Sequence, residues 1–218
     1  MARGLILFLL LAGCTTPKTV LIISKTAGYR HASIEFGVQA ISTIAHDLDF
    51  KVLATEDCSI LCTETYDVVV FLNTTGTILN KEERDCLRSF VEEGGGFLGI
   101  HSAADTEYDW PWYGETLLGA WFVSHPPVSE STITIHDRSH PSTVHLQADW
   151  ICTDEWYVYD RVPEKSRVLL SVHGHPLAWC KEIKKGKSFY TGRGHTNACF
   201  TESDFIEHIK GGLKWVVQ

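Results

Sequence analysis

Residues 92–103, EEGGGFLGIHSA, are typical of a helix end, a glycine-rich turn and a buried strand that breaks sharply at His101. Open α/β sheets bind their ligands at the carboxyl ends of parallel strands, and this histidine follows such an end. A thiol or hydroxyl at this kind of elbow would indicate acyl transfer. An imidazole indicates acid–base catalysis, metal ligation or polar recognition, and a buried structural histidine is the alternative.

Apolar runs and helical spacings alternate on the N-terminal side of this stretch. Residues 20–24 and 68–72 are continuous apolar runs, typical of strands buried on both faces. Between them, apolar residues recur at helical spacing over 34–48, and residues 50–55 predict another strand. This order predicts a doubly wound, mostly parallel α/β sheet with helices on both faces.

The remaining elements are predicted from caps and shorter apolar runs. Asn80 and Glu83 have the spacing of a capping box at the start of a helix. The last helix is expected to start near Thr201 or Ser203. Later strands are expected at residues 97–100, 132–135, 168–171, 177–180 and 188–191. No linker divides the chain, so residues 19–218 are predicted to form a single domain.

The composition and net charge limit the kinds of partner that the protein can bind. The chain has 218 residues, of which 44% are hydrophobic and 21% charged, as in ordinary globular proteins. Its formal net charge is -8. Phosphate binding needs a basic face, so we expect no nucleic-acid partner.

The N-terminus is typical of an exported protein. Arg3 precedes a short apolar run at 5–11, which is too short to span a bilayer but suits a secretory signal. Leu11-Ala12-Gly13-Cys14 resembles the lipobox of bacterial lipoproteins. The resemblance implies a signal peptide over 1–13, a lipidated Cys14 and a linker over 14–18. An ordinary signal peptide is the alternative.

This prediction implies a place in the cell. The protein would be anchored by lipid in the bacterial cell envelope and would face the periplasm. Threonine after Cys14 favours the outer membrane over the inner one, by analogy with enteric sorting.

Export would permit disulfides among the remaining cysteines. Cys58 and Cys62 are close enough in sequence to pair, and the cysteine spacings match no common zinc pattern. Buried free thiols are expected for Cys86, Cys180 and Cys199. His46, His145 and His208 fall on helical or surface-like stretches, where we expect them to be solvated.

Polar and aromatic residues follow several predicted strands or precede helices. These candidate site residues are Tyr29, Arg30, His31, Asn73, Thr74, His101, Asp105, Trp110, His125, Glu155, Arg193 and His195. Scattered histidines and carboxylates can assemble a zinc or other divalent site with an open position. His101, His125 and His195 are the metal candidates, and such a site requires that they converge.

Six segments resemble the ThuA-like family, whose founding members belong to bacterial trehalose utilisation. They are SKTAGYRH (24–31), FLNTTG (71–76), GGFLGIHSAADT (95–106), YDWPWY (108–113), TDEWY (153–157) and YTGRGHT (190–196). The resemblance implies a flavodoxin-like fold similar to the class I glutamine amidotransferases. Their nucleophile would fall at or beside His101, where this chain has no cysteine, so the usual thiol route of glutamine hydrolysis is excluded.

The resemblance also implies a role in the metabolism of trehalose, another disaccharide or a 3-keto-glycoside. In that role His101 and His195 would be an acid–base pair, acting directly or through a divalent metal, with Glu155 assisting and Asp105 orienting. Tyr29, Arg30, His31, Asn73, Thr74, Trp110, His125 and Arg193 would bind the sugar. The alternatives are a non-catalytic carbohydrate-binding lipoprotein that serves a partner enzyme or transporter, and a structural accessory domain.

Overall fold

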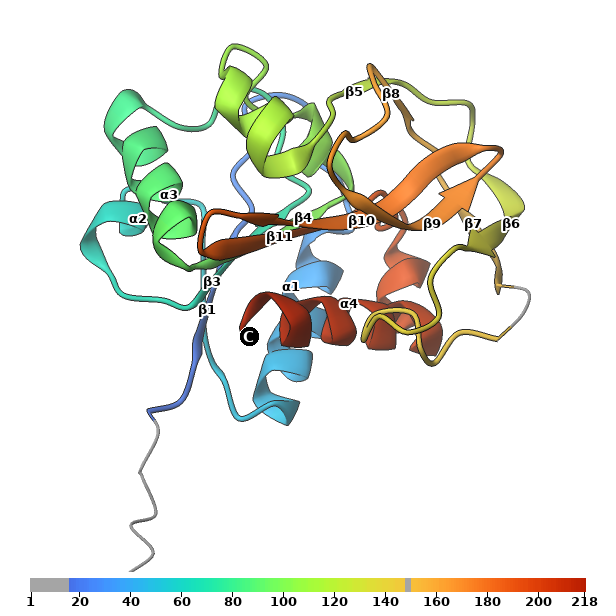
Figure 1. Ribbon diagram of the computed structural model, residues 1–218, viewed down its shortest axis with the longest axis horizontal. Helices are drawn as coiled ribbons and strands as arrows, with labels where there is room; N and C mark the ends of the chain where they lie inside the picture. Colours follow the sequence, from blue (N-terminus) through green and yellow to red (C-terminus); the bar gives the residue numbers. More distant parts are fainter. Residues whose placement is uncertain (1–15, 148–149) are drawn as a thin grey trace, which may run out of the picture.

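A nine-stranded sheet runs through the centre of the computed structural model, which describes residues 16–147 and 150–218 (Figure 1). In chain order the strands are β1 Thr19–Ile23, β2 Lys51–Thr55, β3 Val68–Leu72, β4 Gly96–Ile100, β5 Phe122–Ser124, β6 Ser129–Ile135, β7 Trp150–Asp154, β8 Val158–Tyr159, β9 Arg167–Val172, β10 His175–Ile183 and β11 Gly186–Thr191. The helices are α1 Ile34–Asp47, α2 Ile60–Thr63, α3 Lys81–Glu93 and α4 Ser203–Val216, with 3₁₀ turns η1 His101–Asp105 and η3 Asn197–Thr201 and the π-helix η2 Trp112–Leu118.

The sheet has a parallel half and an antiparallel half. Its order is β2-β1-β3-β4-β11-β10-β9-β6-β7, and the pairs from β2 to β11 are all parallel. The order β2-β1-β3-β4 is that of flavodoxin-like folds, so the predicted fold class is confirmed. The pairs from β11 to β7 are antiparallel, and β5 pairs with β8 in a separate small sheet.

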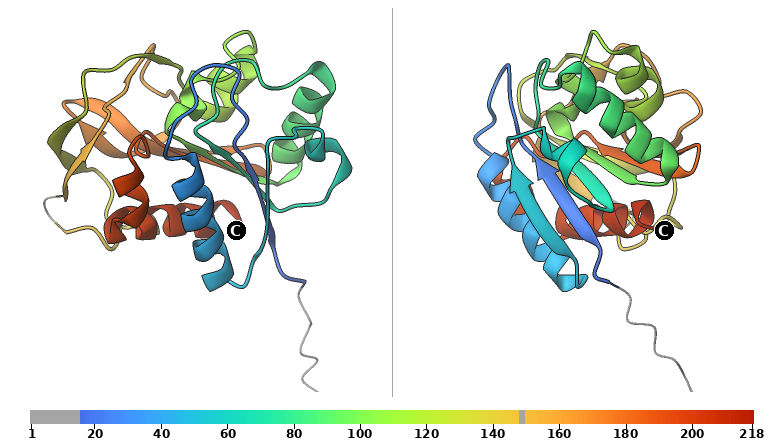
Figure 2. Two further views of the ribbon diagram at one scale, coloured as in Figure 1. Left: turned by 180° about the vertical axis from the view of Figure 1, so that it is seen from behind. Right: turned by 90° about the vertical axis from the view of Figure 1, so that its left-hand side faces the viewer.

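Successive residues of the central strands supply two cores. Val20 and Ile22 face α1 and α4, whereas Leu21 and Ile23 face α2 and α3 together with η2. This is the two-residue alternation of a strand covered on both faces. Figure 2 shows α1 and α4 together on one side of the sheet and α3 on the other. The capping box is confirmed at α3: Asn80 accepts from the Glu83 amide, and the Glu83 carboxylate accepts from the Asn80 amide.

The predicted signal peptide, residues 1–13, and the predicted lipidation site, Cys14, lie outside the described residues. No helix within 16–147 or 150–218 combines the length and apolar character needed to cross a bilayer.

Cys58 and Cys62, which are close enough in sequence to pair, do not form a disulfide with each other. Cys62 forms a disulfide with Cys86, so Cys86 is not a free thiol, and Cys58 is buried and free. The reason is tertiary, since α2 lies beside α3 and brings Cys62 and Cys86 together, whereas Cys58 packs into the core under α3. Cys180 and Cys199 are buried free thiols, as predicted.

Loss of this disulfide is expected to lower the free energy of unfolding by about 3 kcal/mol, because the bond closes a long loop that otherwise gains entropy on unfolding. The two cysteines are separated by 24 positions. Urea unfolding with and without a reductant measures the effect, and Cys62→Ser/Cys86→Ser is the control. A reductant effect of the same size in the control would show that the disulfide is not its source.

His208 is fully buried in α4, so its predicted solvation is wrong, whereas His46 is exposed as predicted. His145 is half-buried and its Nε2 lies 2.9 Å from the Asp204 carbonyl oxygen. Burial lowers the pKa of His208 to about 3 and that of His140 to about 4. Both rings flank Phe189 in the core between the sheet and α4.

The lowered pKa values of His208 and His140 predict that the protein loses stability in acid. Below pH 6.5 the unfolded chain binds protons that the folded protein excludes, so stability is expected to fall with pH until about pH 3–4. The loss should reach a few kcal/mol per histidine. Urea unfolding of His208→Gln at pH 7 and pH 4.5 measures it. The loss between these pH values should shrink in His208→Gln and stay unchanged in His46→Gln.

Candidate functional site

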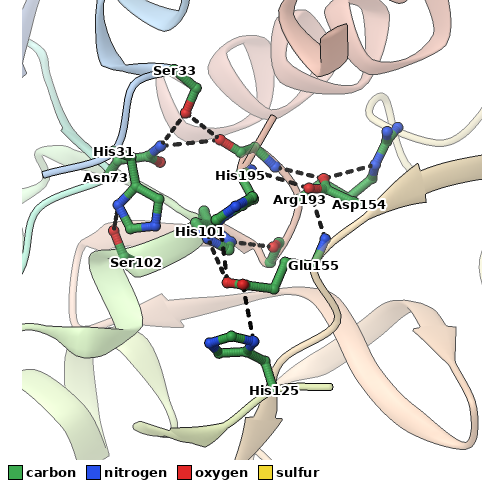
Figure 3. A network of polar contacts seen from close by, with 12 residues as sticks. His31, Ser33, Asn73, His101, Ser102, His125, Asp154, Glu155, Arg193 and His195 are labelled. Atoms are coloured by element: carbon green, nitrogen blue, oxygen red, sulfur yellow. Dashed lines mark hydrogen bonds and ion pairs between the residues drawn. The ribbon is translucent and has the colours of Figure 1, made fainter. Parts of the chain in front are cut away.

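Four predicted site residues converge at the carboxyl edge of the parallel strands (Figure 3). His31 lies between β1 and α1, His101 directly follows β4, Glu155 directly follows β7, and His195 lies after β11. One donor atom from each of the four lies within 4.8 Å of the others. We call these four residues the His–Glu cluster; three of them are buried and His195 is half-buried.

Glu155 is the centre of the contacts. Its Oε2 lies 3.5 Å from His101 Nε2 and 3.3 Å from His195 Nδ1, and these two imidazole nitrogens are 3.3 Å apart. Its other oxygen, Oε1, lies 2.9 Å from Nδ1 of His125, which follows β5. The predicted pair of His101 and His195 is therefore assembled around one carboxylate.

Backbone and hydroxyl groups orient the buried imidazoles. His101 Nδ1 lies 2.9 Å from the Gly192 carbonyl oxygen, to which it donates, so Nε2 is the nitrogen that faces Glu155 and His195. His31 Nδ1 lies 3.3 Å from Ser102 Oγ, and its other nitrogen faces His101 (Figure 3). His101 has a φ of 49°, the left-handed backbone typical of a strained strand-end elbow. The predicted orientation of His101 by Asp105 is thus supplied by Gly192 instead.

One buried carboxylate that the sequence analysis did not identify joins two loops of the site. Asp154 Oδ1 accepts from the amides of Glu155, at 2.9 Å, and His195, at 3.2 Å. Its Oδ2 accepts from the Gly194 amide at 2.9 Å and lies 3.5 Å from Arg193 Nε. The available signal was an acid immediately before Glu155, which does not distinguish a backbone acceptor from a second site carboxylate.

Hydrogen bonds and burial shift the protonation of the cluster. Burial, together with the imidazoles of His101 and His195, lowers the pKa of His31 to about 3. Burial alone would raise the pKa of Glu155, but hydrogen bonds from His101 and His195 outweigh it and hold that pKa well below its usual range. The hydrogen bond to Glu155 raises the pKa of His195. The cluster therefore holds an ionised carboxylate among imidazoles.

The cluster forms part of the wall of a cavity of about 350 Å³. This is the lower end of the size range of small-molecule sites. The lining residues are Tyr29, His31, Asp105, Phe122, His125, Glu155, Tyr157 and His195. The Tyr157 ring packs against both His101 and Phe122, each at 4.2 Å between ring centroids. A hollow of about 370 Å³ elsewhere is lined mainly by exposed charged side chains, without a histidine.

Asn73 and Thr74 do not line the cavity. The Asn73 amide nitrogen donates to Ser33 Oγ and the Gly194 carbonyl, and Thr74 is hydrogen-bonded to Thr106. All of these contacts are buried. The two predicted ligand-binding residues thus hold neighbouring loops together.

Arg30 and Trp110 also lie outside the cavity lining. Arg30 is exposed and forms ion pairs with Glu35 and Glu56. Trp110 is half-buried and packs on the α3 side of the sheet, with the Arg84 guanidinium over its ring. An aromatic, proline-broken segment is as suitable for packing as for binding, and here Trp110 packs.

Arg193 is fully buried, so the predicted contact with substrate is replaced by internal contacts. Its guanidinium lies between the rings of Trp150 and Phe205, at 4.7 and 4.9 Å from their centroids. Its ion pairs are with Asp154 and, at 2.7 Å, with Glu202. The residue supports the loop that carries the last histidine of the cluster.

Comparison with known proteins agrees with this architecture. A putative ThuA-like protein from Bacteroides uniformis is 26% identical, with a TM-score of 0.77 over 92% of this chain and 91% of that one. A putative ThuA-like protein from Parabacteroides merdae is 18% identical, with a TM-score of 0.78 over 93% and 91%. At that identity the likeness shows the fold alone.

A region of a larger enzyme shares the fold as well. A β-galactosidase from Bacillus circulans sp. alkalophilus matches 92% of this chain with 30% of its own, at 16% identity and a TM-score of 0.58. No curated protein sequence matches the chain significantly. The profile of the ThuA family, described as trehalose utilisation, matches residues 19–216. The chain therefore belongs to the ThuA family.

Proposed function

We propose that the protein is an exported enzyme that acts on a sugar, with the His–Glu cluster as its reaction centre. The observation that carries the proposal is the convergence of three imidazoles and one carboxylate on one cavity at the carboxyl edge of the sheet. Membership of a family described as trehalose utilisation supports a disaccharide or an oxidised, 3-keto glycoside as the substrate.

Two further titratable groups border the same cavity and suit proton transfer. Burial raises the pKa of Asp105, outweighing the hydrogen bond that it accepts from Tyr108. A carboxyl group with a raised pKa can exchange protons at neutral pH more readily than an exposed one. His125 is partly exposed and contacts Glu155, so it lies between the cluster and solvent. We assign Asp105 and His125 as the groups that exchange protons with the substrate.

The cavity walls support a sugar rather than a charged metabolite. Tyr29, Phe122 and Tyr157 present aromatic rings around the cluster, and such rings pack on the apolar faces of sugars. No lysine or arginine lines this cavity, so an anionic group would find no permanently charged partner among its lining residues.

Glutamine hydrolysis is not supported by the free thiols of the described residues. Cys58, Cys152, Cys180 and Cys199 are all buried. Burial raises the pKa of Cys199 to about 11 and that of each of the others to about 12. These thiols stay protonated at neutral pH, whereas the nucleophile would have to be a thiolate.

Export and lipidation at Cys14 belong to the same proposal. The Cys62–Cys86 disulfide supports it, because structural disulfides are common in oxidising compartments such as the periplasm and rare in the cytosol. Mass spectrometry of the protein purified from bacterial membranes tests it, since a diacylglyceryl group on Cys14 is the expected result.

The experiment that tests the enzymatic function is a turnover screen of disaccharides and their 3-keto forms with the wild-type protein and Glu155→Gln. We expect one class to be converted, and conversion to be lost in Glu155→Gln. Glu130→Gln, at an exposed position on β6, is the matched control and should retain activity. Saturable sugar binding without product would replace this proposal with a carbohydrate-binding function.

A further inference from the structure

We propose that His31, His101, Glu155 and His195 bind one divalent transition-metal ion, with a fifth coordination position open toward the cavity. The inference deepens the proposed function, because it names the group that would make this cluster reactive. It rests on distances, on the contacts behind the donors and on charge, each of which is independent of the sugar. Ion binding and sugar turnover can therefore be tested apart.

Three donors of the cluster are spaced as in a coordination shell, and the fourth lies beside them. Nitrogen and oxygen donors bind zinc at about 2.0–2.2 Å, so neighbouring donors of one ion lie about 3.0–3.6 Å apart at bond angles of about 90–120°. The three separations among His101 Nε2, His195 Nδ1 and Glu155 Oε2 are 3.3, 3.3 and 3.5 Å. His31 supplies the fourth donor within the 4.8 Å limit of the set.

Hydrogen bonds on the far side of the donor groups orient them for metal binding. Metal-binding histidines usually donate their second ring nitrogen to a carbonyl or another oxygen, which aims the first nitrogen at the ion. His101 has such a contact with the Gly192 carbonyl oxygen, and His31 has one with Ser102 Oγ. The second oxygen of Glu155 is held by His125. Three of the four donors thus have an outer partner.

The negative charge of the Glu155 carboxylate favours a bound cation at this site. Among the described residues, the ion-pair partners of Glu155 are all histidines, and no lysine or arginine contacts it. A buried carboxylate is costly without a partner or a bound metal. Imidazole donors suit zinc, iron, nickel and copper, whereas magnesium and calcium prefer all-oxygen sites. The ion expected here is therefore a first-row transition metal.

An ion bound by the cluster would act on a substrate in the cavity. It would polarise a sugar carbonyl or hydroxyl oxygen as a Lewis acid. Asp105 and His125 line the same cavity and are not members of the cluster, so neither would be a ligand of the ion and both could exchange protons with the substrate. This division assigns charge stabilisation to the cluster and proton transfer to its neighbours.

Metal binding to the full chain tests the inference. The protein is stripped with a chelator and titrated with Zn²⁺ by calorimetry and with Co²⁺ by visible spectroscopy. We expect one ion per chain, and an affinity at least 100-fold lower in His31→Asn, His195→Asn and Glu155→Gln. His46→Asn, at an exposed position on α1, should bind like the wild type. Circular dichroism identifies any variant that fails to fold.

The outcomes separate this inference from the proposed function. Absence of binding in the folded wild type, or binding that survives all three cluster variants, overturns the metal site. Sugar turnover that persists after complete metal removal overturns the Lewis-acid role of the ion and leaves the enzymatic function intact. One tightly bound ion with no turnover of any sugar leaves the metal site intact and overturns the enzymatic function.

Discussion

His101→Asn is expected to lower kcat/KM by about 10³-fold on whichever sugar the wild type converts. Removal of one positioned acid, base or donor typically costs 10²–10⁴-fold. His101 places Nε2 between Glu155 and His195, within 3.5 Å of both partner atoms. The loss should appear mainly in kcat, because His101 is fully buried beneath the residues that line the cavity.

Asparagine is the best replacement for this test because the backbone of His101 is in the left-handed region. His101 has a φ of 49°, a conformation that asparagine tolerates better than most residues. His101→Ala would add backbone strain to the loss of the imidazole. Steady-state kinetics give the effect, and His46→Asn should be as active as the wild type. Near-wild-type kcat/KM in a folded His101→Asn protein would remove His101 from the reaction centre.

Asp154→Ala is expected to lower the free energy of unfolding by about 3–5 kcal/mol, the range for breaking a buried ion pair. Asp154 is fully buried and accepts from three backbone amides and from Cys199 Sγ at 3.0 Å. Its removal would leave those donors unsatisfied and Arg193 with one remaining carboxylate, Glu202. The same substitution should weaken the site, because the loops of Glu155 and His195 lose their common acceptor.

Two variants separate these contributions. Asp154→Asn keeps the size and one acceptor, so about half of the loss is expected. Glu202→Gln removes charge from the other side of Arg193 without touching the amides of Glu155 or His195. Because Glu202 is partly exposed, about 1 kcal/mol is expected there. Urea unfolding gives the values, and equal losses in Asp154→Ala and Glu202→Gln would argue against a positioning role for Asp154.

The parallel half of the fold could be predicted because its strands are continuous apolar runs. The antiparallel half was harder to predict from the sequence pattern. In β7, buried Trp150 and Cys152 alternate with exposed Ile151 and Thr153, so its apolar side chains do not stand on one face. At the other end of the sheet, β2 is an edge strand that is mostly exposed, and a strand was predicted there at residues 50–55. Strand β8 has only two residues, too few for a pattern.

The sequence could predict those site residues whose position is determined by the end of a strand. His101 and His195 each follow a parallel strand, so the shared edge brings them together. Which side chains turn inward could not be predicted. Asn73 also follows a parallel strand, but with a φ of 48° its amide points to Ser33 and Gly194 and away from the cavity. Such choices depend on partners 40 and 121 positions away, which no local pattern contains.

The four members of the His–Glu cluster stand on four different connections, between residues 31 and 195. A partly folded chain cannot assemble them, so an ion held there would bind the native state alone. Such linkage adds about 2.7 kcal/mol to the stability when the free ion is present at 100 times its Kd. The resistance of the chain to proteases would then rise and fall with the supply of the ion, and so would its abundance.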